Sequence, residues 1–192
     1  MHSFEEVSLR TKRLLLRPLD EADAPQLFLL HSDAQVSRYL SRPPWESIDK
    51  AIELIALDKE AHRARKYIRL GIQRTEDALL IGECSLHSLN EASRRAEVGY
   101  AMRPLAWGNG YMAEALAQLL QFAFETLQLN RIEADIDPRN QASARNLERF
   151  GFKKEGYLRE RWIVRGEVSD SALYGLLQAD WRAQRGEPRS EA

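Results

Sequence analysis

Arg103–Leu116 reads "RPLAWGNGYMAEAL", with two glycines between a proline-bearing segment and a strong helix former. The residues before it alternate as in a strand, and from Gly110 apolar side chains recur at the 3.6-residue period of a helix. The glycines therefore mark a strand-to-helix junction, where free backbone N–H groups and the positive end of the helix attract phosphate. A plain tight turn is the alternative interpretation of the same pattern.

The apolar period changes along the chain on both sides of this junction. A strand and three helices precede three strand-like segments, and after the junction come a helix, a strand, a short helix and a closing hairpin. This order predicts an α+β protein with one central βαβ unit, folded as a single domain over residues 9–178 with flexible termini over 1–8 and 183–192. The expected strands are residues 10–18, 66–74, 78–89, 95–105, 131–137, 153–164 and 169–177, and the expected helices are 21–30, 32–40, one from Ser47, one from Gly110, and 140–152.

Spacing within the first helices predicts their buried faces. Asp20 is expected to cap a helix that places Leu27 and Leu30 on one face. In the helix after Ser47, Ile52, Ile55 and Ala56 repeat at helical spacing, which indicates one apolar face.

Composition excludes several classes of protein. The chain has 192 residues, 44% of them hydrophobic and 30% charged, with a formal net charge of −1, so no basic nucleic-acid surface is indicated. Its apolar runs are too short for a membrane span, and its first ten residues lack the apolar stretch of a signal peptide. The single cysteine, Cys84, allows no internal disulfide and fits a reducing, cytoplasmic location. A buried structural thiol is the favoured interpretation of Cys84, and a nucleophile the alternative.

The glycines leave more than one phosphate ligand open. No Lys-Ser or Lys-Thr follows them, as a nucleoside-triphosphate loop requires. "GNGYMA" does satisfy G-x-G-x-x-A, and Glu133, Asp135 and Asp137 follow Ala113 by 20, 22 and 24 residues, near the place of a ribose-binding acid. Against a dinucleotide, Arg103 and Pro104 separate the strand from the glycines, and too few strands follow for a doubly wound sheet.

Two longer stretches carry a family resemblance. "EVGYAMRPLAWGNGYMAEAL", followed by "RIEADIDPRNQASARNLERFGF", resembles the GNAT acetyltransferase superfamily, in particular its RimJ/RimL-like branch of N-terminal amine acetyltransferases. The opening "LRTKRLLLRPLDEADA" and the closing "EGYLRERWIVRGEVSDSALYGLL" are similar to that branch as well, so the resemblance spans roughly Leu9 to Leu177. It implies a mixed, mostly antiparallel central sheet with one splayed pair of strands and helices on both faces.

The resemblance also implies acetyl-CoA as co-substrate. The loop over residues 107–112 would hold the pyrophosphate, with Trp107 at the first place of the family's loop pattern and Met112 where a small residue is usual. The splayed strands would free backbone groups near Tyr100 for the pantetheine arm and for the thioester carbonyl. The implied cofactor-binding residues are Tyr100, Met102, Arg103, Trp107, Gly108, Asn109, Gly110, Tyr111, Met112, Asn140 and Ser143.

Two residues are implied in the chemistry. Glu97, on the strand that leads to the cofactor, would accept the proton of the attacking amine, although a surface glutamate is the alternative interpretation. Ser143 would lie near the sulfur, and Asn140 would bind pantetheine while it also caps the following helix. Leu147 stands where many relatives have a tyrosine that protonates the thiolate, so Ser143 or solvent must supply any proton that is needed.

The acceptor implied by the resemblance is a primary amine, and we expect the N-terminal amine of a protein or peptide. At pH 7 a lysine costs about 3 kcal/mol more to deprotonate than a chain-terminal amine. Direct attack in a ternary complex is expected, because Cys84 has no base partner in the sequence. We expect Tyr39, Trp45 and Trp162 to border the acceptor groove, with core packing as the alternative.

Further alternatives stay open. The acceptor could be a small-molecule amine such as an antibiotic or a polyamine, or the chain could bind acyl-CoA as a sensor without turnover. The four histidines show no ligand spacing, so no metal is assigned. We expect a monomer or a homodimer.

Overall fold

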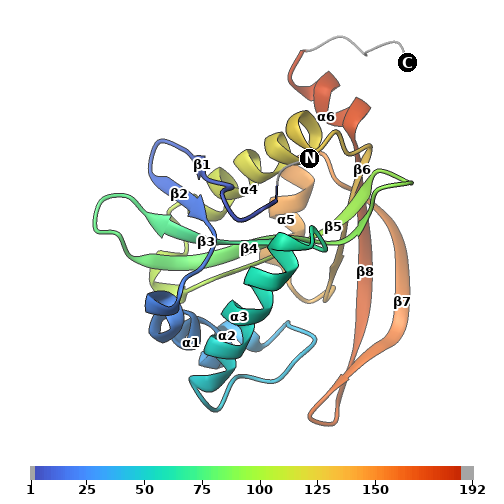
Figure 1. Ribbon diagram of the computed structural model, residues 1–192. Coiled ribbons are helices and arrows are strands. Elements are labelled where there is room, and N and C mark those ends of the chain that lie inside the picture. The colour runs from blue at the N-terminus through green and yellow to red at the C-terminus, as the bar shows by residue number, and fades with distance from the viewer. Residues whose placement is uncertain (1–2, 187–192) are drawn as a thin grey trace.

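The computed structural model describes residues 3–186 and contains one eight-stranded sheet (Figure 1). The strand order across the sheet is β1-β2-β3-β4-β5-β6-β8-β7, and every neighbouring pair is antiparallel except β5 and β6. The α+β expectation is therefore confirmed. The strands are β1 (Leu9–Arg10), β2 (Leu14–Arg17), β3 (Ile68–Arg74), β4 (Leu80–Asn90), β5 (Arg95–Met102), β6 (Arg131–Ile136), β7 (Lys153–Val164) and β8 (Glu167–Leu177).

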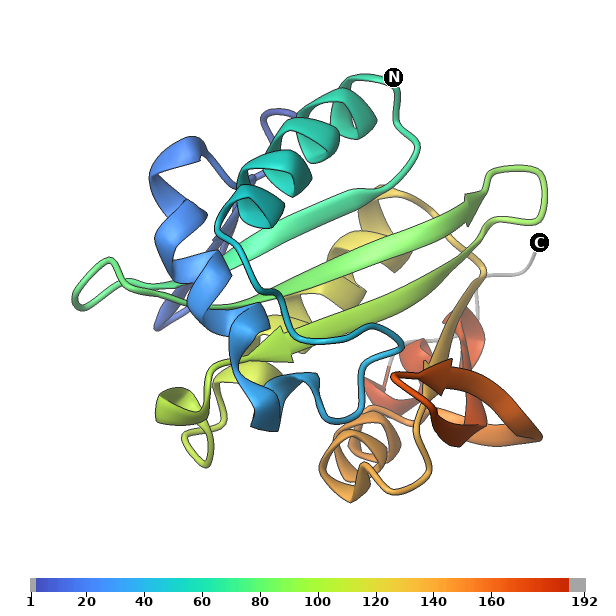
Figure 2. The same cartoon turned by 90° about the horizontal axis from the view of Figure 1, so that it is seen from below.

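Helices cover both faces of the sheet (Figures 1 and 2). One face carries the first three helices, which pack around a core that includes Leu27, Leu30 and Ile55. The other face carries α4 and α5, and Leu116 and Leu147 belong to the larger core there. The helices are α1 (Ala24–Ser32), α2 (Ala34–Ser37), α3 (Asp49–Arg63), α4 (Tyr111–Gln121), α5 (Gln141–Arg149) and α6 (Gln178–Gln184).

Asp20 caps the first helical segment as its position predicted. Its side chain accepts a hydrogen bond from the Ala22 N–H (2.9 Å), and the Asp23 carboxylate accepts one from the Asp20 N–H (2.9 Å). This reciprocal pair opens a short 3-10 turn that continues into α1. The cap fixes the register in which Leu27 and Leu30 are buried.

Of the three residues expected on the apolar face of α3, Ile55 is buried, whereas Ile52 and Ala56 are exposed. Ile52 is 48% exposed, whereas Ile55 and Asp58 are buried. Asp58 forms an ion pair with Arg69 of β3 (3.3 Å), which also pairs with Glu83 of β4 (2.7 Å). Because a buried arginine requires carboxylate partners, the side of α3 that offers Asp58 faces the sheet and Ile52 is left in solvent.

The described parts of the termini are more ordered than expected. Phe4 is 2% exposed in the core, and its N–H donates to His62 O (3.1 Å). The sequence did not predict α6, in which Trp181 packs on Phe124 with ring centroids 5.2 Å apart. Phe4 and the end of α6 at Gln184 are thus packed or helical within the segments expected to be flexible, 1–8 and 183–192; that expectation stays a prediction, and residues 1–2 and 187–192 lie outside the described residues.

The central parallel pair is joined over only three residue pairs. Arg95–Glu97 of β5 pair with Arg131–Glu133 of β6, and beyond Glu97 the two strands no longer pair. From there β6 continues beside β8, as far as the pair of Ile136 with Ala172. The expected splay is therefore present, and it begins at Glu97.

Candidate active site

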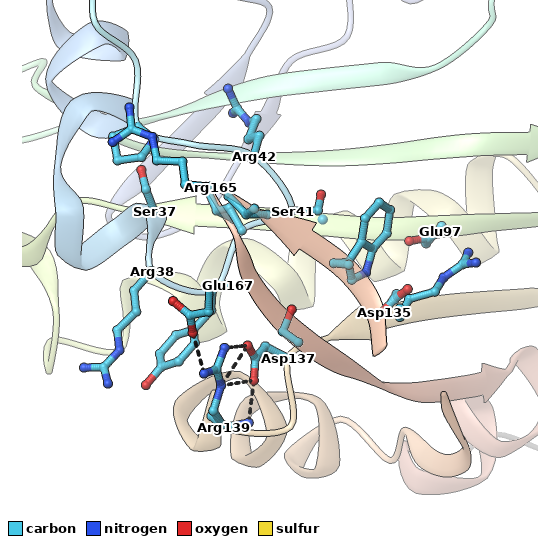
Figure 3. Close-up of a pocket in the computed structure, with 18 of the residues that line it drawn as sticks. Ser37, Arg38, Ser41, Arg42, Glu97, Asp135, Asp137, Arg139, Arg165 and Glu167 are labelled. Carbon is cyan, nitrogen blue, oxygen red and sulfur yellow. Dashed lines mark hydrogen bonds and ion pairs between the residues drawn. The ribbon is translucent and has the colours of Figure 1, made fainter. Parts of the chain in front are cut away.

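Two cavities lie around the split between β5 and β6. The first, here called the α4–α5 cavity, has a volume of about 630 Å³. It lies between the end of β5, the loop over residues 107–112, here called the glycine loop, and α5. The second, the hairpin cavity, has a volume of about 570 Å³ and lies between β4, β5, β6 and the β7–β8 hairpin (Figure 3). Tyr39 and Leu40, which follow α2, line both. The two cavities therefore share a wall beside the split.

The glycine loop opens the α4–α5 cavity. Gly108 and Gly110 both have φ of +76°, a left-handed conformation that favours glycine. A Cβ at Gly108 would meet no protein atom within 4 Å, and one at Gly110 would meet only Arg13 Nη2 at 3.7 Å. Gly110 is the N-cap of α4 and offers no side-chain cap, so the first N–H groups of the helix lack that partner. The loop thus has the space and the donors that a phosphate group requires.

The other loop residues act on the shape of the loop. Trp107 Nε1 donates to Met102 O (2.7 Å), which folds the indole over the end of β5. Asn109 Nδ2 donates to Trp107 O (2.9 Å), and Asn109 O accepts from Arg13 Nη1 (3.0 Å). Arg13 also stacks on the Tyr111 ring, 4.4 Å from its centroid. Asn109 does not line the cavity, whereas Trp107, Tyr111 and Met112 do.

The end of β5 directs alternate N–H groups toward the split. Arg103 N donates to Ile81 O of the β4 side (2.8 Å). Since N–H groups alternate along a strand, those of Tyr100 and Met102 point away from β4, into the opening that β6 has left. The Arg103 side chain binds Gln26 Oε1 (2.5 Å) and lines neither cavity. Among the predicted cofactor residues, Arg103 and Asn109 therefore do not line the α4–α5 cavity, and their role in binding stays a prediction.

The start of α5 brings two more predicted residues to the same cavity. Asn140 Oδ1 accepts from the Ser143 N–H (3.1 Å), so Asn140 caps α5 as expected. The Ser143 hydroxyl lies 2.8 Å from the Tyr100 hydroxyl of β5. Leu147 is fully buried in the core and does not line the cavity.

Glu97 lines the hairpin cavity at the last pair before the split. Its nearest basic group is His87 Nε2, 4.0 Å from Glu97 Oε1, and His87 is its cross-strand partner on β4. Burial raises the pKa of Glu97, and the neighbouring carboxylates of Asp135 and Glu133 raise it further, while Arg161 opposes them. Burial also lowers the pKa of His87. Both pKa shifts favour the uncharged form of the side chain. Shifts of this kind are typical of groups that exchange protons near neutral pH.

The remaining acids of the hairpin cavity are neutralised. Arg139 binds both Asp137 (2.6 Å) and Glu167 (2.6 Å), as the dashed lines of Figure 3 show. Within residues 3–186, no arginine or lysine lies within 4 Å of the carboxylates of Glu97 and Asp135, and Figure 3 places both at the same end of the cavity. These two carboxylates are thus available to a positively charged ligand.

The three predicted aromatic residues are separated. Tyr39 and Trp162 line the hairpin cavity, and Trp162 Nε1 donates to Ser171 Oγ (3.1 Å). Trp45 lines neither cavity, because its ring packs on His31, with centroids 4.4 Å apart, and its N–H donates to His31 O. Trp45 is partly buried against the core formed by the first helices, and its role in acceptor binding stays a prediction.

Sequence reasoning missed three residues at this site: His87, Asp135 and Arg161. His87 could have been found from the register of the β4–β5 hairpin, which places it opposite Glu97. Asp135 was considered only as a ribose-binding acid, because its face of β6 could not be assigned before the partner strands were known. Arg161 lies on β7, distant in sequence, and no local pattern connects it to the site.

Two kinds of site are not found in the described chain. Between residues 3 and 186, no group of three or more His, Cys, Asp or Glu side chains could hold a metal ion. No helix in that range is long and apolar enough to cross a membrane. Cys84 is buried, and burial raises the pKa of its thiol, which suits the structural interpretation rather than a nucleophile.

Comparisons with known proteins agree with this geometry. A family model described as an acetyltransferase (GNAT) domain matches residues 13–153. YoaA of Bacillus subtilis (strain 168), an uncharacterized N-acetyltransferase, is 36% identical over 170 residues, which cover 88% of this chain and 96% of that protein. The ribosomal protein uS5-alanine N-acetyltransferase of Escherichia coli (strain K12) is 26% identical over 189 residues, 94% of this chain and 95% of that one. The crystal structure of spermidine N-acetyltransferase from Vibrio cholerae in complex with CoA and spermine matches with a TM-score of 0.79 and 25% identity over 89% of this chain and 99% of that one.

The open sheet and these relatives define an acyltransferase. The chain belongs to the GNAT acetyltransferase family and is an N-acetyltransferase. The dinucleotide alternative is wrong, because a doubly wound sheet is mostly parallel and the only parallel pair in the described sheet is β5–β6.

Proposed function

We propose that this chain transfers the acetyl group of acetyl-CoA to the N-terminal amine of a protein or peptide, by direct attack in a ternary complex. The observation that carries the proposal is the split at Glu97, which separates a cavity with phosphate-binding features from a cavity with free carboxylates. Donor and acceptor would enter from opposite sides and meet beside Tyr39 and Leu40, which both cavities share.

The α4–α5 cavity fits acetyl-CoA. The N–H groups at Gly110 and the start of α4 would bind the pyrophosphate, and those of Tyr100 and Met102 would bind the arm as an added strand. When bound, acetyl-CoA supplies an activated acetyl group and a thiol leaving group. An N–H group at the end of β5 would also polarise the acetyl carbonyl.

Glu97 is proposed as the base. An amine attacks only when neutral, so a proton has to leave an acceptor that binds as an ammonium ion. Glu97 has no ion pair with a lysine or arginine of the described chain, and its raised pKa brings its proton affinity closer to that of the amine. Asp135 would hold the ammonium group beside Glu97 before the proton is transferred.

The acceptor is inferred from the charges of the hairpin cavity. Five arginines line it, against the four carboxylates of Glu97, Asp135, Asp137 and Glu167. Arg139 occupies Asp137 and Glu167, so only Glu97 and Asp135 are left for a cation: a peptide N-terminus brings one charge to them, whereas the further charges of a polyamine would find no free carboxylate in this lining. The five arginines are Arg38, Arg42, Arg139, Arg161 and Arg165. We also propose that this acceptor, a protein or peptide N-terminus, is cytoplasmic.

A binding protein that holds acyl-CoA without turnover is the second candidate. Leu147, in place of the tyrosine that many relatives use, favours it, because Leu147 cannot donate a proton. A thiol-release assay over peptides, spermidine and other small amines separates the candidates. Release of the CoA thiol with peptides is expected. Release only with small amines would mean that the acceptor is a small-molecule amine, and binding of acetyl-CoA without thiol release for any acceptor would support the sensor.

Asp135→Asn is expected to raise the KM for the amine by about threefold to fivefold, the value of one partly exposed ion pair. It also removes a negative charge that raises the pKa of Glu97, so the acidic limb of the kcat/KM profile should move to lower pH. The measurement is the pH dependence of kcat/KM. Glu167→Gln is the control, because Arg139 already neutralises that carboxylate, and it should not move the limb. A limb that stays in place in Asp135→Asn would exclude the proposed coupling.

A further inference from the structure

The hydroxyl group of Tyr100 lies within hydrogen-bond distance of the Ser143 hydroxyl. Tyr100 comes from β5 and reaches across the α4–α5 cavity to Ser143 at the start of α5, with 2.8 Å between the two hydroxyl oxygens. At the position on α5 where many relatives have a tyrosine, this chain has Leu147, whose side chain is buried in the core. This chain therefore brings a phenol to the first turn of α5 from the strand instead.

Acidity decides which hydroxyl donates. A phenol is a far stronger acid than an alcohol, so Tyr100 is the better donor and Ser143 Oγ the better acceptor. Burial raises the pKa of Tyr100, so the phenol stays protonated and does not itself become a proton source at neutral pH. Once Ser143 Oγ accepts from Tyr100, the remaining Ser143 O–H is left to point into the cavity.

A second polar side chain of α5 lies beside the Tyr100 hydroxyl. Asn146 is three residues after Ser143, on the same side of α5, and hydrogen bonding from Asn146 and from Ser143 opposes the effect of burial on the pKa of Tyr100. The Ser143 backbone N–H is already bound to Asn140 Oδ1 (3.1 Å). Since that N–H is occupied, the hydroxyl of Ser143 is the donor at the first turn of α5 that remains for an acceptor atom of a ligand.

We propose that Tyr100 is a positioning residue, whose hydroxyl donates to Ser143 Oγ and so turns the Ser143 O–H toward the sulfur of the departing CoA. This rests on the proposed function, because it requires CoA in the α4–α5 cavity. As the C–S bond breaks, its electron pair stays on sulfur, and the Ser143 O–H stabilises that negative charge by a hydrogen bond. The phenol keeps its proton throughout, so Tyr100 acts only through Ser143.

The test measures the thiol pKa of bound CoA, from the ultraviolet absorbance of the thiolate, in wild type, Tyr100→Phe, Ser143→Ala and the double variant. Loss of one hydrogen bond should raise this pKa by about half a unit to one unit in each single variant. Because the two residues act in series, the double variant should shift no further than Ser143→Ala alone. The affinity for CoA over desulfo-CoA should fall in the same pattern.

Tyr174→Phe is the matched control. The Tyr174 hydroxyl of β8 also binds α5, at Glu148 Oε1 (3.3 Å), but does not contact Ser143, so its loss should leave the thiol pKa unchanged. A wild-type thiol pKa in Tyr100→Phe, or additive shifts in the double variant, would overturn the inference. If wild type does not bind CoA at all, the proposed function fails instead.

Discussion

Glu97→Gln should lower kcat/KM for a peptide amine at pH 7 by about 100-fold or more, the contribution of one general base. Glutamine retains the size of the side chain and loses only the site that accepts a proton. Glu97 has no hydrogen bond or close cation in the described structure except His87 at 4.0 Å, so the substitution should leave the fold and the affinity for acetyl-CoA intact. Steady-state kinetics and acetyl-CoA titration measure the two effects separately.

The pH dependence gives this prediction its direction. Glu97 accepts a proton only when ionised, and its pKa is raised by burial and by Asp135 and Glu133. As the pH is lowered, wild-type activity should therefore be lost at a higher pH than it would be if Glu97 had the pKa of an ordinary glutamate. In Glu97→Gln the activity should instead recover above about pH 9, where a chain-terminal amine is neutral without a base. A pH profile identical to that of wild type would remove Glu97 from the mechanism and leave it the surface glutamate of the alternative interpretation.

Gly110→Val should weaken the binding of CoA by about tenfold or more, equivalent to at least 1.4 kcal/mol. A Cβ at Gly110 meets only Arg13 Nη2 at 3.7 Å, so the protein itself has room for it. Its methyl groups would instead occupy the space in front of the first N–H groups of α4, where we propose that the pyrophosphate lies. Isothermal titration of CoA measures the loss.

Backbone strain has to be separated from lost contact in this experiment. Gly110 has φ of +76°, and a β-branched residue there is strained, so the variant should also be less stable. Gly166→Val is the matched control, because Gly166 has φ of +83° in the β7–β8 turn and equally open surroundings. It should lose stability without losing CoA affinity. Equal CoA affinity in Gly110→Val and wild type would mean that the phosphates bind elsewhere.

Local patterns were sufficient for most of the elements. The capping position of Asp20, the 3.6-residue period after Gly110 and the alternation around Glu97 each depend on residues close in sequence, and each was confirmed. The prediction for α3 was confirmed for the helix and for the burial of Ile55 and was wrong for Ile52, because the inward face of α3 also depends on Arg69 and Glu83, two residues of neighbouring strands. α6 was missed because its burial depends on Phe124, far along the chain.

The sequence by itself determined the class of fold, the position of the glycine loop at the start of α4, and Glu97 as the candidate base. These follow from periodicity, from glycine at left-handed positions and from motif resemblance, all of which are local. Only the tertiary structure decided that Arg103 and Trp45 lie outside both cavities, and that His87, Asp135 and Arg161 line the hairpin cavity with Glu97. The physical reason is that strand pairing and register set which side chains share a face, and both depend on contacts between residues distant in sequence.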